Sequence, residues 1–472
     1  MPAEIDLSAF PRGSVTAPAG CGKTQLIADT LAAHTDAKPI LILTHTNAGV
    51  AALRSRLQRA HIQTSKYQVA TLDGFAMRLI SKFPKRSGHD PAILLLENRA
   101  HDYPAIRNAA GLLLHSGHIS TVIRASYSRL LVDEYQDCNQ SQHVIVAWLA
   151  QSVPTYVLGD PMQAIFGFRG NSLVNWQTDV IPRFPSIGNL DTPWRWRRAN
   201  TEQLGRWLLE LRQPLAAGEG IDLRNAPQEV EWIAIRPETA EAQRRNAALV
   251  RIRDGESALI IGDSANPASR FRLSSQTPGA TAVENVELSE LISFARSFDP
   301  TSDQALNQLV DLAASVMTGV GAAALMGRVA IIMGGRNRTE PTAIERSAVD
   351  FHQAPSLAAA ACLLERFGAQ AGTHVYRPEV FRACLNALRI AAAGTHSLRD
   401  AAMQVRERNR VLGRPLSRRA VGSTLLLKGL ESDIAVILNP SQMDANNLYV
   451  AMTRGAKKLV ICSETPILTP RR

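Results

Sequence analysis

Eight residues near the N-terminus have the composition of a phosphate-binding loop. They read Ala17-Pro18-Ala19-Gly20-Cys21-Gly22-Lys23-Thr24, between a short apolar run and a helical pattern. Glycines let backbone N–H groups turn inward around phosphate oxygens, and the start of a helix adds positive potential. We therefore expect all eight residues to bind a nucleotide, with Lys23 at the β- and γ-phosphates and Thr24 as a ligand of Mg²⁺.

A second motif ends an apolar run further along the chain. It reads Arg129-Leu-Leu-Val-Asp133-Glu134-Tyr-Gln-Asp137. A strand that ends in Asp-Glu places one carboxylate near a metal and a second near the water that attacks the γ-phosphate. We expect Asp133 to bind Mg²⁺ and Glu134 to act as the general base. Such a pair also occurs at ordinary surface turns, so it is the upstream phosphate loop that makes an ATPase the better interpretation.

Apolar runs stand in front of these and other polar motifs. We expect strands at Ser14–Thr16, Ile40–Thr44, Leu130–Val132, Thr155–Leu158, Ala258–Gly262, Ile434–Leu438 and Leu459–Cys462. Helical patterns separate the runs, and this alternation is typical of doubly wound parallel sheets of the α/β class. Such sheets bind ligands at the carboxyl ends of their strands, which is where the polar motifs fall.

Composition limits the class of protein. The 472 residues, 45% hydrophobic and 20% charged, are enough for two to four globular domains. The sequence has no run of 18 apolar residues and no signal-like N-terminus, so we expect a cytoplasmic protein without a membrane partner. Five scattered cysteines predict neither a disulfide framework nor a zinc site. A net charge of +10 suits a polyanionic partner, although a merely basic soluble protein has the same excess.

Further motifs identify the kind of ATPase. In chain order they are Thr44-His-Thr46-Asn47, Thr71-Leu-Asp73-Gly-Phe75, Leu158-Gly-Asp160-Pro-Met-Gln163-Ala-Ile165-Phe166-Gly-Phe168-Arg169-Gly170, Pro193-Trp194-Arg195, Lys428-Gly429-Leu430-Glu431 and Tyr449-Val-Ala-Met-Thr453-Arg454-Gly-Ala456-Lys457. Together with the two motifs above, the set resembles the ordered motifs of UvrD/Rep-like superfamily 1 DNA helicases. The matches span residues 17 to 458, nearly the whole chain.

The resemblance implies two RecA-like parallel-sheet motor domains with helical insertions, in a compact form. We expect the first motor domain at residues 1–82 and 126–186, with a small helical insertion at 83–125. The second is expected at 187–275 and 414–472, with a mostly helical insertion at 276–413. A cluster of Pro182, Pro185 and Gly188 favours a break between the halves near Phe184–Gly188.

The resemblance also implies roles around ATP. Gln163 is expected to contact the γ-phosphate or the attacking water. Arg195 and Arg454, from the second half, would stabilise charge on the transferring phosphoryl oxygens, although Arg197 and Arg198 compete with Arg195 for that role. Three further residues are expected to contact the nucleotide, namely Trp194 by stacking on adenine, and Gly429 and Glu431.

A second group of residues is implied for a DNA strand. Phe166 and Phe168 occupy positions that stack on bases, with Arg169 near a phosphate, and their alternative role is that of core phenylalanines. Three polar residues, Thr46, Asn47 and Thr71, are expected to touch the strand backbone.

The chain departs from the family pattern at several positions. We find no adenine-contacting Gln before the phosphate loop, and Asp73 and Leu425 stand where the family has histidines. An arginine-rich stretch leads out of the long insertion and fits either a phosphate-binding or a solvated face. It contains Arg406, Arg408, Arg410, Arg414, Arg418 and Arg419.

Two functions from different classes remain open. The first is an ATP-dependent single-stranded DNA translocase or helicase, with 3′-to-5′ polarity implied by resemblance alone. It would act on single strands or tailed duplexes. The second is a DNA-stimulated ATPase that regulates a partner nuclease in bacterial repair or antiviral defence. A short stretch, Gln276-Thr-Pro with the helix through Leu288–Phe294, resembles the helicase-like subunit of Gabija-type anti-phage systems. A P-loop protein without turnover conflicts with the intact catalytic residues.

Overall fold

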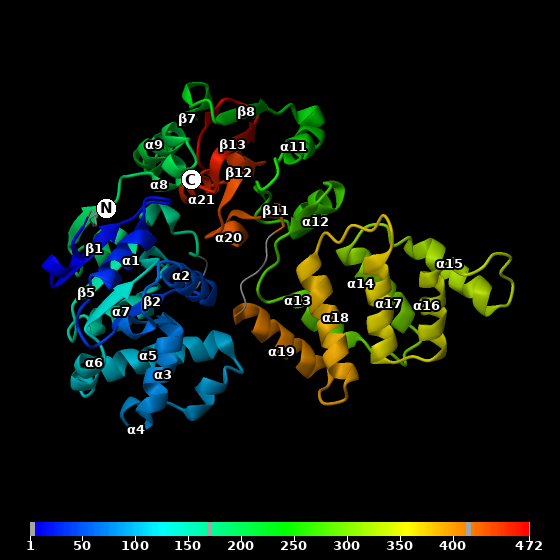
Figure 1. Ribbon diagram of the computed structural model, residues 1–472, viewed down its shortest axis with the longest axis horizontal. Coiled ribbons are helices and arrows are strands. Elements are labelled where there is room, and N and C mark those ends of the chain that lie inside the picture. The colour runs from blue at the N-terminus through cyan, green and yellow to red at the C-terminus, as the bar shows by residue number, and fades with distance from the viewer. Residues whose placement is uncertain (1–4, 168–171, 412–416, 472) are drawn as a thin grey trace. The chain divides into compact units, whose positions relative to one another are not determined.

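The structure is a computed structural model that describes residues 5–167, 172–411 and 417–471, in two compact units (Figure 1). The first unit comprises residues 5–230, 441–457 and 467–471, and the second comprises residues 231–440 and 458–466. The two units are described separately. Among the described residues, none of the helices has the length and apolar composition to cross a membrane.

The first unit is built on a six-stranded sheet. Its strands are β1 (Arg12–Thr16), β2 (Ile40–Thr44), β3 (Tyr67–Thr71), β4 (Arg129–Val132), β5 (Thr155–Gly159) and β6 (Ser186–Asn189). They lie in the order β3-β2-β4-β5-β1-β6, and every neighbouring pair is parallel. Thus β5 lies between β1 and β4, the strands that lead into the two catalytic motifs.

Helices cover both faces of this sheet, as Figure 1 shows. They are α1 (Lys23–Ala32), α2 (Asn47–Arg59), α3 (Leu72–Lys82), α4 (Pro84–Ser87), α5 (Arg99–His115), α6 (Ser120–Ser126) and α7 (Gln140–Leu149). Successive side chains of a strand point to opposite faces, so Leu41 and Leu43 enter the core under α3, α5 and α7, whereas Ile40 and Ile42 enter the core under α1 and α2. Strands buried on both faces explain why these runs are continuously apolar.

The first unit also holds the segments that carry the predicted arginines. They are α8 (Trp194–Arg198), α9 (Glu202–Glu210), α10 (Arg212–Ala216) and α21 (Ala445–Met452). A short antiparallel ribbon of β7 (Ile221–Asp222) and β14 (Ile467–Leu468) completes it.

The second unit contains another six-stranded sheet. Its strands are β8 (Val230–Ala234), β9 (Ala258–Ile261), β10 (Ala280–Ala282), β11 (Arg419–Gly422), β12 (Ser432–Ile437) and β13 (Gly455–Ser463), in the order β10-β11-β9-β12-β13-β8. The pairs β10–β11, β11–β9 and β9–β12 are parallel. Three helices accompany the sheet: α11 (Ala240–Ala248), α12 (Pro267–Gln276) and α20 (Thr424–Leu427).

A bundle of seven helices lies between β10 and β11 in the sequence, coloured from green to orange in Figure 1. It consists of α13 (Ser289–Ser297), α14 (Ala305–Val316), α15 (Ala322–Met333), α16 (Ala343–Gln353), α17 (Leu357–Ala369), α18 (Pro378–Ala392) and α19 (Leu398–Val411). The bundle has its own core, which includes Leu309, Phe351, Phe367 and Leu388.

These sheets confirm the α/β class with two RecA-like sheets and helical insertions. All seven expected strands are present, with ends shifted by a few residues. The strand β6 overlaps the expected break at Phe184–Gly188 and pairs with β1, so this stretch belongs to the first sheet. The predicted domain boundaries as a whole stay a prediction.

Candidate active site

The phosphate loop connects β1 to α1. Its backbone turns through two glycines in the left-handed region, Gly20 at φ +71° and Gly22 at φ +93°, a conformation that side-chain-bearing residues rarely adopt. Space is short as well, because a Cβ on Gly20 would lie 2.7 Å from the Trp196 ring and one on Gly22 would lie 3.0 Å from Trp194 Cδ1. The loop therefore needs glycine at both positions for two separate reasons.

The three residues expected to drive hydrolysis lie together. Lys23 Nζ is 2.8 Å from Asp133 Oδ1 and also forms an ion pair with Glu134. Burial alone lowers the pKa of Lys23, but the two adjacent carboxylates outweigh burial, and its pKa stands above the ordinary value. The lysine is thus held as a cation at the position where phosphate oxygens would compete with the carboxylates for it.

Sheet order explains this convergence. The phosphate loop, the Asp133-Glu134 pair and Asp160 follow the carboxyl ends of β1, β4 and β5, three neighbouring parallel strands. The Ala17 N–H donates to the Gly159 carbonyl over 2.8 Å, which joins the loop to the end of β5. Parallel strands bring their carboxyl ends to one edge of a sheet, so motifs far apart in sequence become neighbours.

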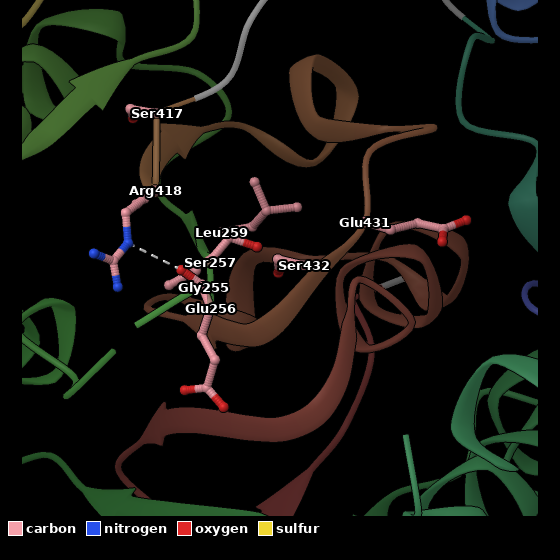
Figure 2. Close-up of a pocket in the computed structure, with 9 residues that line it drawn as sticks. Gly255, Glu256, Ser257, Leu259, Ser417, Arg418, Glu431 and Ser432 are labelled. Atoms are coloured by element: carbon pink, nitrogen blue, oxygen red, sulfur yellow. Dashed lines mark hydrogen bonds between the residues drawn. The ribbon is translucent and has the colours of Figure 1, made fainter. Parts of the chain in front are cut away.

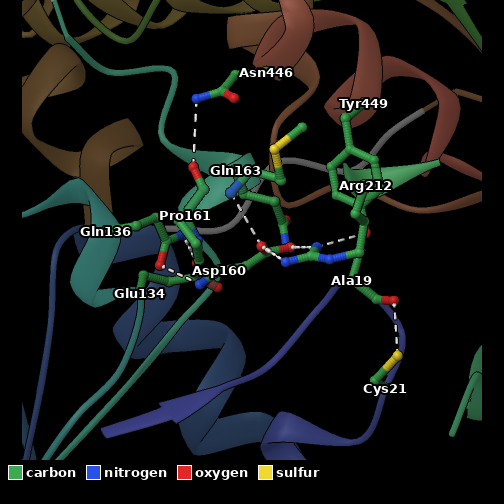
Figure 3. Close-up of polar contacts among 11 residues, drawn as sticks. Ala19, Cys21, Glu134, Gln136, Asp160, Pro161, Gln163, Arg212, Asn446 and Tyr449 are labelled. Atoms are coloured by element: carbon green, nitrogen blue, oxygen red, sulfur yellow. Dashed lines mark hydrogen bonds and ion pairs between the residues drawn. The ribbon is translucent and has the colours of Figure 1, made fainter. Parts of the chain in front are cut away.

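Glu134 adopts a left-handed backbone, with φ +56°, directly after β4. Its carboxylate accepts a 2.6 Å hydrogen bond from Gln136 Nε2, and Gln136 Oε1 accepts one from the Asp160 N–H over 3.0 Å (Figure 3). The Gln163 amide donates to Asp160 Oδ2 over 2.8 Å. The expected general base and the expected phosphate sensor are therefore linked through Gln136 and Asp160.

Three of the expected residues surround the phosphate loop from elsewhere in the unit. The Arg195 N–H donates to the Gly20 carbonyl over 3.1 Å, and Trp194 lies against Gly22. Arg195 Nη1 donates over 2.6 Å to the carbonyl of Thr453, the residue before Arg454. Arg454 is buried, and its Nε donates to the Val450 carbonyl over 2.9 Å. The first unit thus contains both expected arginines beside linked backbone segments.

The remaining loop residues are buried or half-buried. The Cys21 side chain is buried, and burial raises the pKa of its thiol to about 12. Such a thiol stays protonated at neutral pH and is a poor nucleophile. This agrees with the expectation that the cysteine fills space and does no chemistry.

Sequence reasoning missed three residues at this site. Arg56 Nη1 donates to Thr24 Oγ1, the expected Mg²⁺ ligand, over 2.8 Å. Arg212 pairs with Asp160, as described below, and Gln136 bridges Glu134 to β5. Only Gln136 had a signal, because it lies within the Asp-Glu-Tyr-Gln-Asp string. The two arginines lie outside every quoted motif.

Two expected nucleotide contacts, Gly429 and Glu431, belong to the second unit. Gly429 has φ +80°. Glu431 lines a cavity of about 330 Å³ at the amino ends of β9, β11 and β12, where Figure 2 shows it on the opposite side from Arg418. The predicted roles of Gly429 and Glu431 stay predictions.

Three expected DNA contacts lie at starts of helices. The hydroxyls of Thr46 and Thr71 accept the N–H groups of Gly49 and Gly74 over 3.0 Å, so they cap α2 and α3. Asn47 opens α2 and is exposed. Hydroxyls used as caps explain these threonines structurally, and contact with a strand stays a prediction.

The aromatic pair is only partly described. Phe166 is half-buried, and its ring centroid lies 5.6 Å from that of His45. It is not among the buried residues of the core, so the alternative of a core phenylalanine is not supported for it. Phe168 and Arg169 lie outside the described residues.

The departure at Asp73 has a structural reason. Its carboxylate accepts two hydrogen bonds from Arg107, at 2.7 and 2.6 Å, and a third from Gln142 Nε2 at 3.1 Å. Asp73 thus joins α3 to α5 and α7. Leu425, the second departure, is exposed on α20.

The arginine-rich stretch is largely paired with acids or carbonyls. Arg406 and Arg410 form ion pairs with Glu287 and Glu407, and Arg419 donates to the Val250 carbonyl over 2.7 Å. Arg418 pairs with Asp254. Arg414 lies outside the described residues. These pairs favour a structural face over a phosphate-binding one.

The part of the chain that carries this site matches a known family. Residues 12–107 and 94–179 match the model of the UvrD/REP helicase N-terminal domain. Residues 12–179 are a UvrD/REP helicase N-terminal domain. Its span includes the phosphate loop, the Asp133-Glu134 pair and Gln163.

This helicase domain is also similar to two curated proteins, each named as a component of an ATP-dependent helicase/nuclease. The protein of Leuconostoc mesenteroides is 33% identical over 73 residues, 16% of this chain and 6% of the relative. The protein of Enterococcus faecalis is 39% identical over 59 residues, 12% of this chain and 5% of the relative. The chain thus aligns with a small part of either relative's length.

Among solved structures, the complex of Arterivirus nonstructural protein 10 (helicase) with DNA is similar at a TM-score of 0.29 and 11% identity. The match covers 56% of this chain and 50% of that chain. A similarity of this size carries no argument, so the topology above is the basis for the fold class.

Proposed function

We propose that this protein is an ATP-dependent translocase or helicase that moves along single-stranded DNA. One observation carries the proposal: Lys23, Asp133 and Glu134 converge at the carboxyl edge of the first sheet, within a UvrD/REP helicase N-terminal domain. These are the residue types that phosphoryl transfer to water needs, namely a cation for the phosphates, a metal-binding carboxylate and a base.

The proposed chemistry assigns each group one task. Thr24 and Asp133 have the oxygen donors that suit Mg²⁺, which would neutralise charge on the β- and γ-phosphates when bound. Lys23 would exchange its carboxylate partners for phosphate oxygens, which frees Glu134 to accept a proton from the attacking water. Gln163 would report whether the γ-phosphate is intact.

The proposed track is formed by the helix starts at Thr46, Asn47 and Thr71 and by the ring of Phe166, with Phe168 and Arg169 as further candidates. Base stacking on aromatic rings tolerates any sequence and contributes about 1–3 kcal/mol per base, which suits a moving motor. The polarity, 3′ to 5′, is proposed on family resemblance alone.

The test is the rate of ATP hydrolysis with and without single-stranded DNA, with single-stranded RNA as the comparison. We expect stimulation by DNA, and displacement of a strand from a 3′-tailed duplex but not from a 5′-tailed one. Affinity for the strand should fall steeply as salt rises, because phosphate contacts release counterions. A protein that hydrolyses no ATP with either nucleic acid would contradict the proposal.

The alternative is a DNA-stimulated ATPase that regulates a partner nuclease. It is favoured by the short helical insertions, by the replaced family histidines at Asp73 and Leu425, and by relatives whose name joins a helicase to a nuclease. Robust DNA-stimulated hydrolysis without any strand displacement would support this function over the first. A role in repair or in antiviral defence of the Gabija type is a further prediction, which gene neighbourhood would test.

A further inference from the structure

A buried polar chain in the first unit connects Gln163 to helix α21 through Arg212. We infer that Arg212 is a positioning residue for ATP hydrolysis: it holds the loop that carries Gln163 in register with the segment that carries Arg454. The inference rests on the proposed function, because it assigns Arg212 a task at the same ATP site.

The first link of the chain is Asp160, at the end of β5. Its carboxylate is almost fully buried, with 1% of the side chain exposed. Oδ1 accepts the Met162 N–H over 3.1 Å, and Oδ2 accepts the Gln163 amide over 2.8 Å. Asp160 therefore determines both the turn after β5 and the direction of the Gln163 side chain.

The second link is Arg212, which opens α10. Nη2 donates to Asp160 Oδ1 over 2.6 Å and Nη1 donates to Oδ2 over 2.8 Å, so the pair is bidentate (Figure 3). Burial alone lowers the pKa of Arg212, but the charge of Asp160 outweighs burial and raises it. A planar guanidinium that meets both carboxylate oxygens restricts orientation as well as distance.

The third link is Tyr449 on α21. Its hydroxyl accepts a 3.0 Å hydrogen bond from Arg212 Nη1, and the guanidinium carbon lies 5.2 Å from the centre of its ring. Tyr449 is fully buried. A second contact joins the same two segments, since Asn446 Nδ2 donates to the Ala164 carbonyl over 3.0 Å. Helix α21 is therefore bound to the Gln163 loop at two points.

Arg454 follows directly from this helix. Its Nε and Nη2 donate to the Val450 carbonyl and to the Thr453 hydroxyl, at 2.9 and 3.0 Å. The guanidinium is thus held by the C-terminal turn of α21, and a shift of the helix carries Arg454 with it. Because Arg212 contacts both Asp160 and Tyr449, a change at Gln163 is transmitted to Arg454 through one side chain.

The electrostatics explain why arginine is needed. Without Arg212, Asp160 would be a buried carboxylate without its cation, and it would draw other donors toward it or take up a proton. Either response changes the acceptor that orients Gln163. Lysine keeps the charge but cannot meet both carboxylate oxygens and the Tyr449 hydroxyl in one plane.

The experiment compares steady-state hydrolysis of ATP, with saturating single-stranded DNA, in the wild type and in Tyr449→Phe, Arg212→Lys and Arg212→Met. Rates are divided by the number of nucleotide-binding sites, titrated with a fluorescent ATP analogue, so that misfolded protein does not count. Arg206→Met is the matched control, because Arg206 pairs with Glu202 on the exposed face of the neighbouring helix α9. We expect the control to keep wild-type kcat.

For Arg212→Met we expect kcat to fall about tenfold or more with KM for ATP within about twofold, as for loss of a charged hydrogen bond that acts on the transition state. Tyr449→Phe, which loses one hydroxyl and should fold normally, should lower kcat about threefold. Arg212→Lys should lie between the two. The double variant Arg212→Met/Tyr449→Phe should be no slower than Arg212→Met, because the hydroxyl acts through Arg212.

Two outcomes would overturn the inference. The first is wild-type kcat per site in both Tyr449→Phe and Arg212→Lys, and the second is a double variant whose losses multiply. Both require an active wild type. A wild type that hydrolyses no ATP contradicts the proposed function itself, so the two failures are distinguishable.

Discussion

Lys23 Nζ lies 2.8 Å from Asp133 Oδ1 although 110 positions separate the two residues in the chain. The ion pair also includes Glu134, so one buried cation serves two carboxylates. Without that cation the carboxylates would repel each other in a poorly solvated site. The lysine is therefore needed twice, for the integrity of the site and for phosphate binding.

The first prediction concerns the general base. Glu134→Gln keeps the shape of the side chain but removes its ability to take a proton, so turnover should fall about 10²- to 10⁴-fold. ATP binding, measured by calorimetry, should persist because Lys23 and the loop glycines are unchanged. Hydrolysis at the wild-type rate in this variant would refute the assignment of Glu134.

The second prediction concerns the strand. Phe166→Ala should weaken affinity for single-stranded DNA by about 1–3 kcal/mol if the ring stacks on a base, as measured by fluorescence anisotropy. Phe10→Ala is a suitable control, because Phe10 is an exposed phenylalanine that precedes β1 and belongs to no strand-contact motif. Equal affinities for the Phe166 and Phe10 variants would exclude the stacking role.

The third prediction concerns the aspartate that replaces a family histidine. Arg107→Met leaves Asp73 without its bidentate partner beneath α3 and α5, so unfolding free energy should drop by about 3 kcal/mol. Arg206→Met removes an exposed i,i+4 pair and should cost less than about 1 kcal/mol. Urea unfolding of both variants measures the difference. If the two losses are alike, Asp73 has no special structural role.

The fourth prediction concerns pH. Burial, with a smaller effect of Arg183, lowers the pKa of His143 below its ordinary value of 6.5. The folded protein therefore binds this proton later than the unfolded chain as pH falls, so His143 should reduce stability below pH about 6.5 and have little effect above it.

His143→Asn tests this prediction, because the amide can still meet the Tyr135 hydroxyl, which lies 2.8 Å from His143 Nδ1. Thermal midpoints of the two proteins should converge as pH is lowered from 7.5 to about 5.5, with the wild type losing more. Parallel curves for the two proteins would show that His143 does not titrate within the fold.

Much of the ATP site was predictable from local sequence. The phosphate loop, the Asp133-Glu134 pair and Gln163 each lie within a few residues of a strand end, and their residue types state their chemistry. The expected strands were also found, because a strand buried on both faces must be apolar throughout.

Contacts between distant segments were not predictable in this way. Asp73 looked like a lost histidine until Arg107 was found beside it, and nothing around Arg56 marks it as a partner of Thr24. Arg212 is one arginine among many, and only the packing of α10 beside β5 and α21 shows what it joins.

The sequence alone therefore determined which groups can bind phosphate, hold a metal or take a proton, since those properties belong to side chains and to their immediate backbone. Tertiary structure decided which of them meet. Apolar periodicity tells a strand that it is buried but not which strand lies beside it, whereas the order β4-β5-β1 brings Lys23, Glu134 and Asp160 to one edge. Ion pairs across that edge depend on this order, and no short motif encodes it.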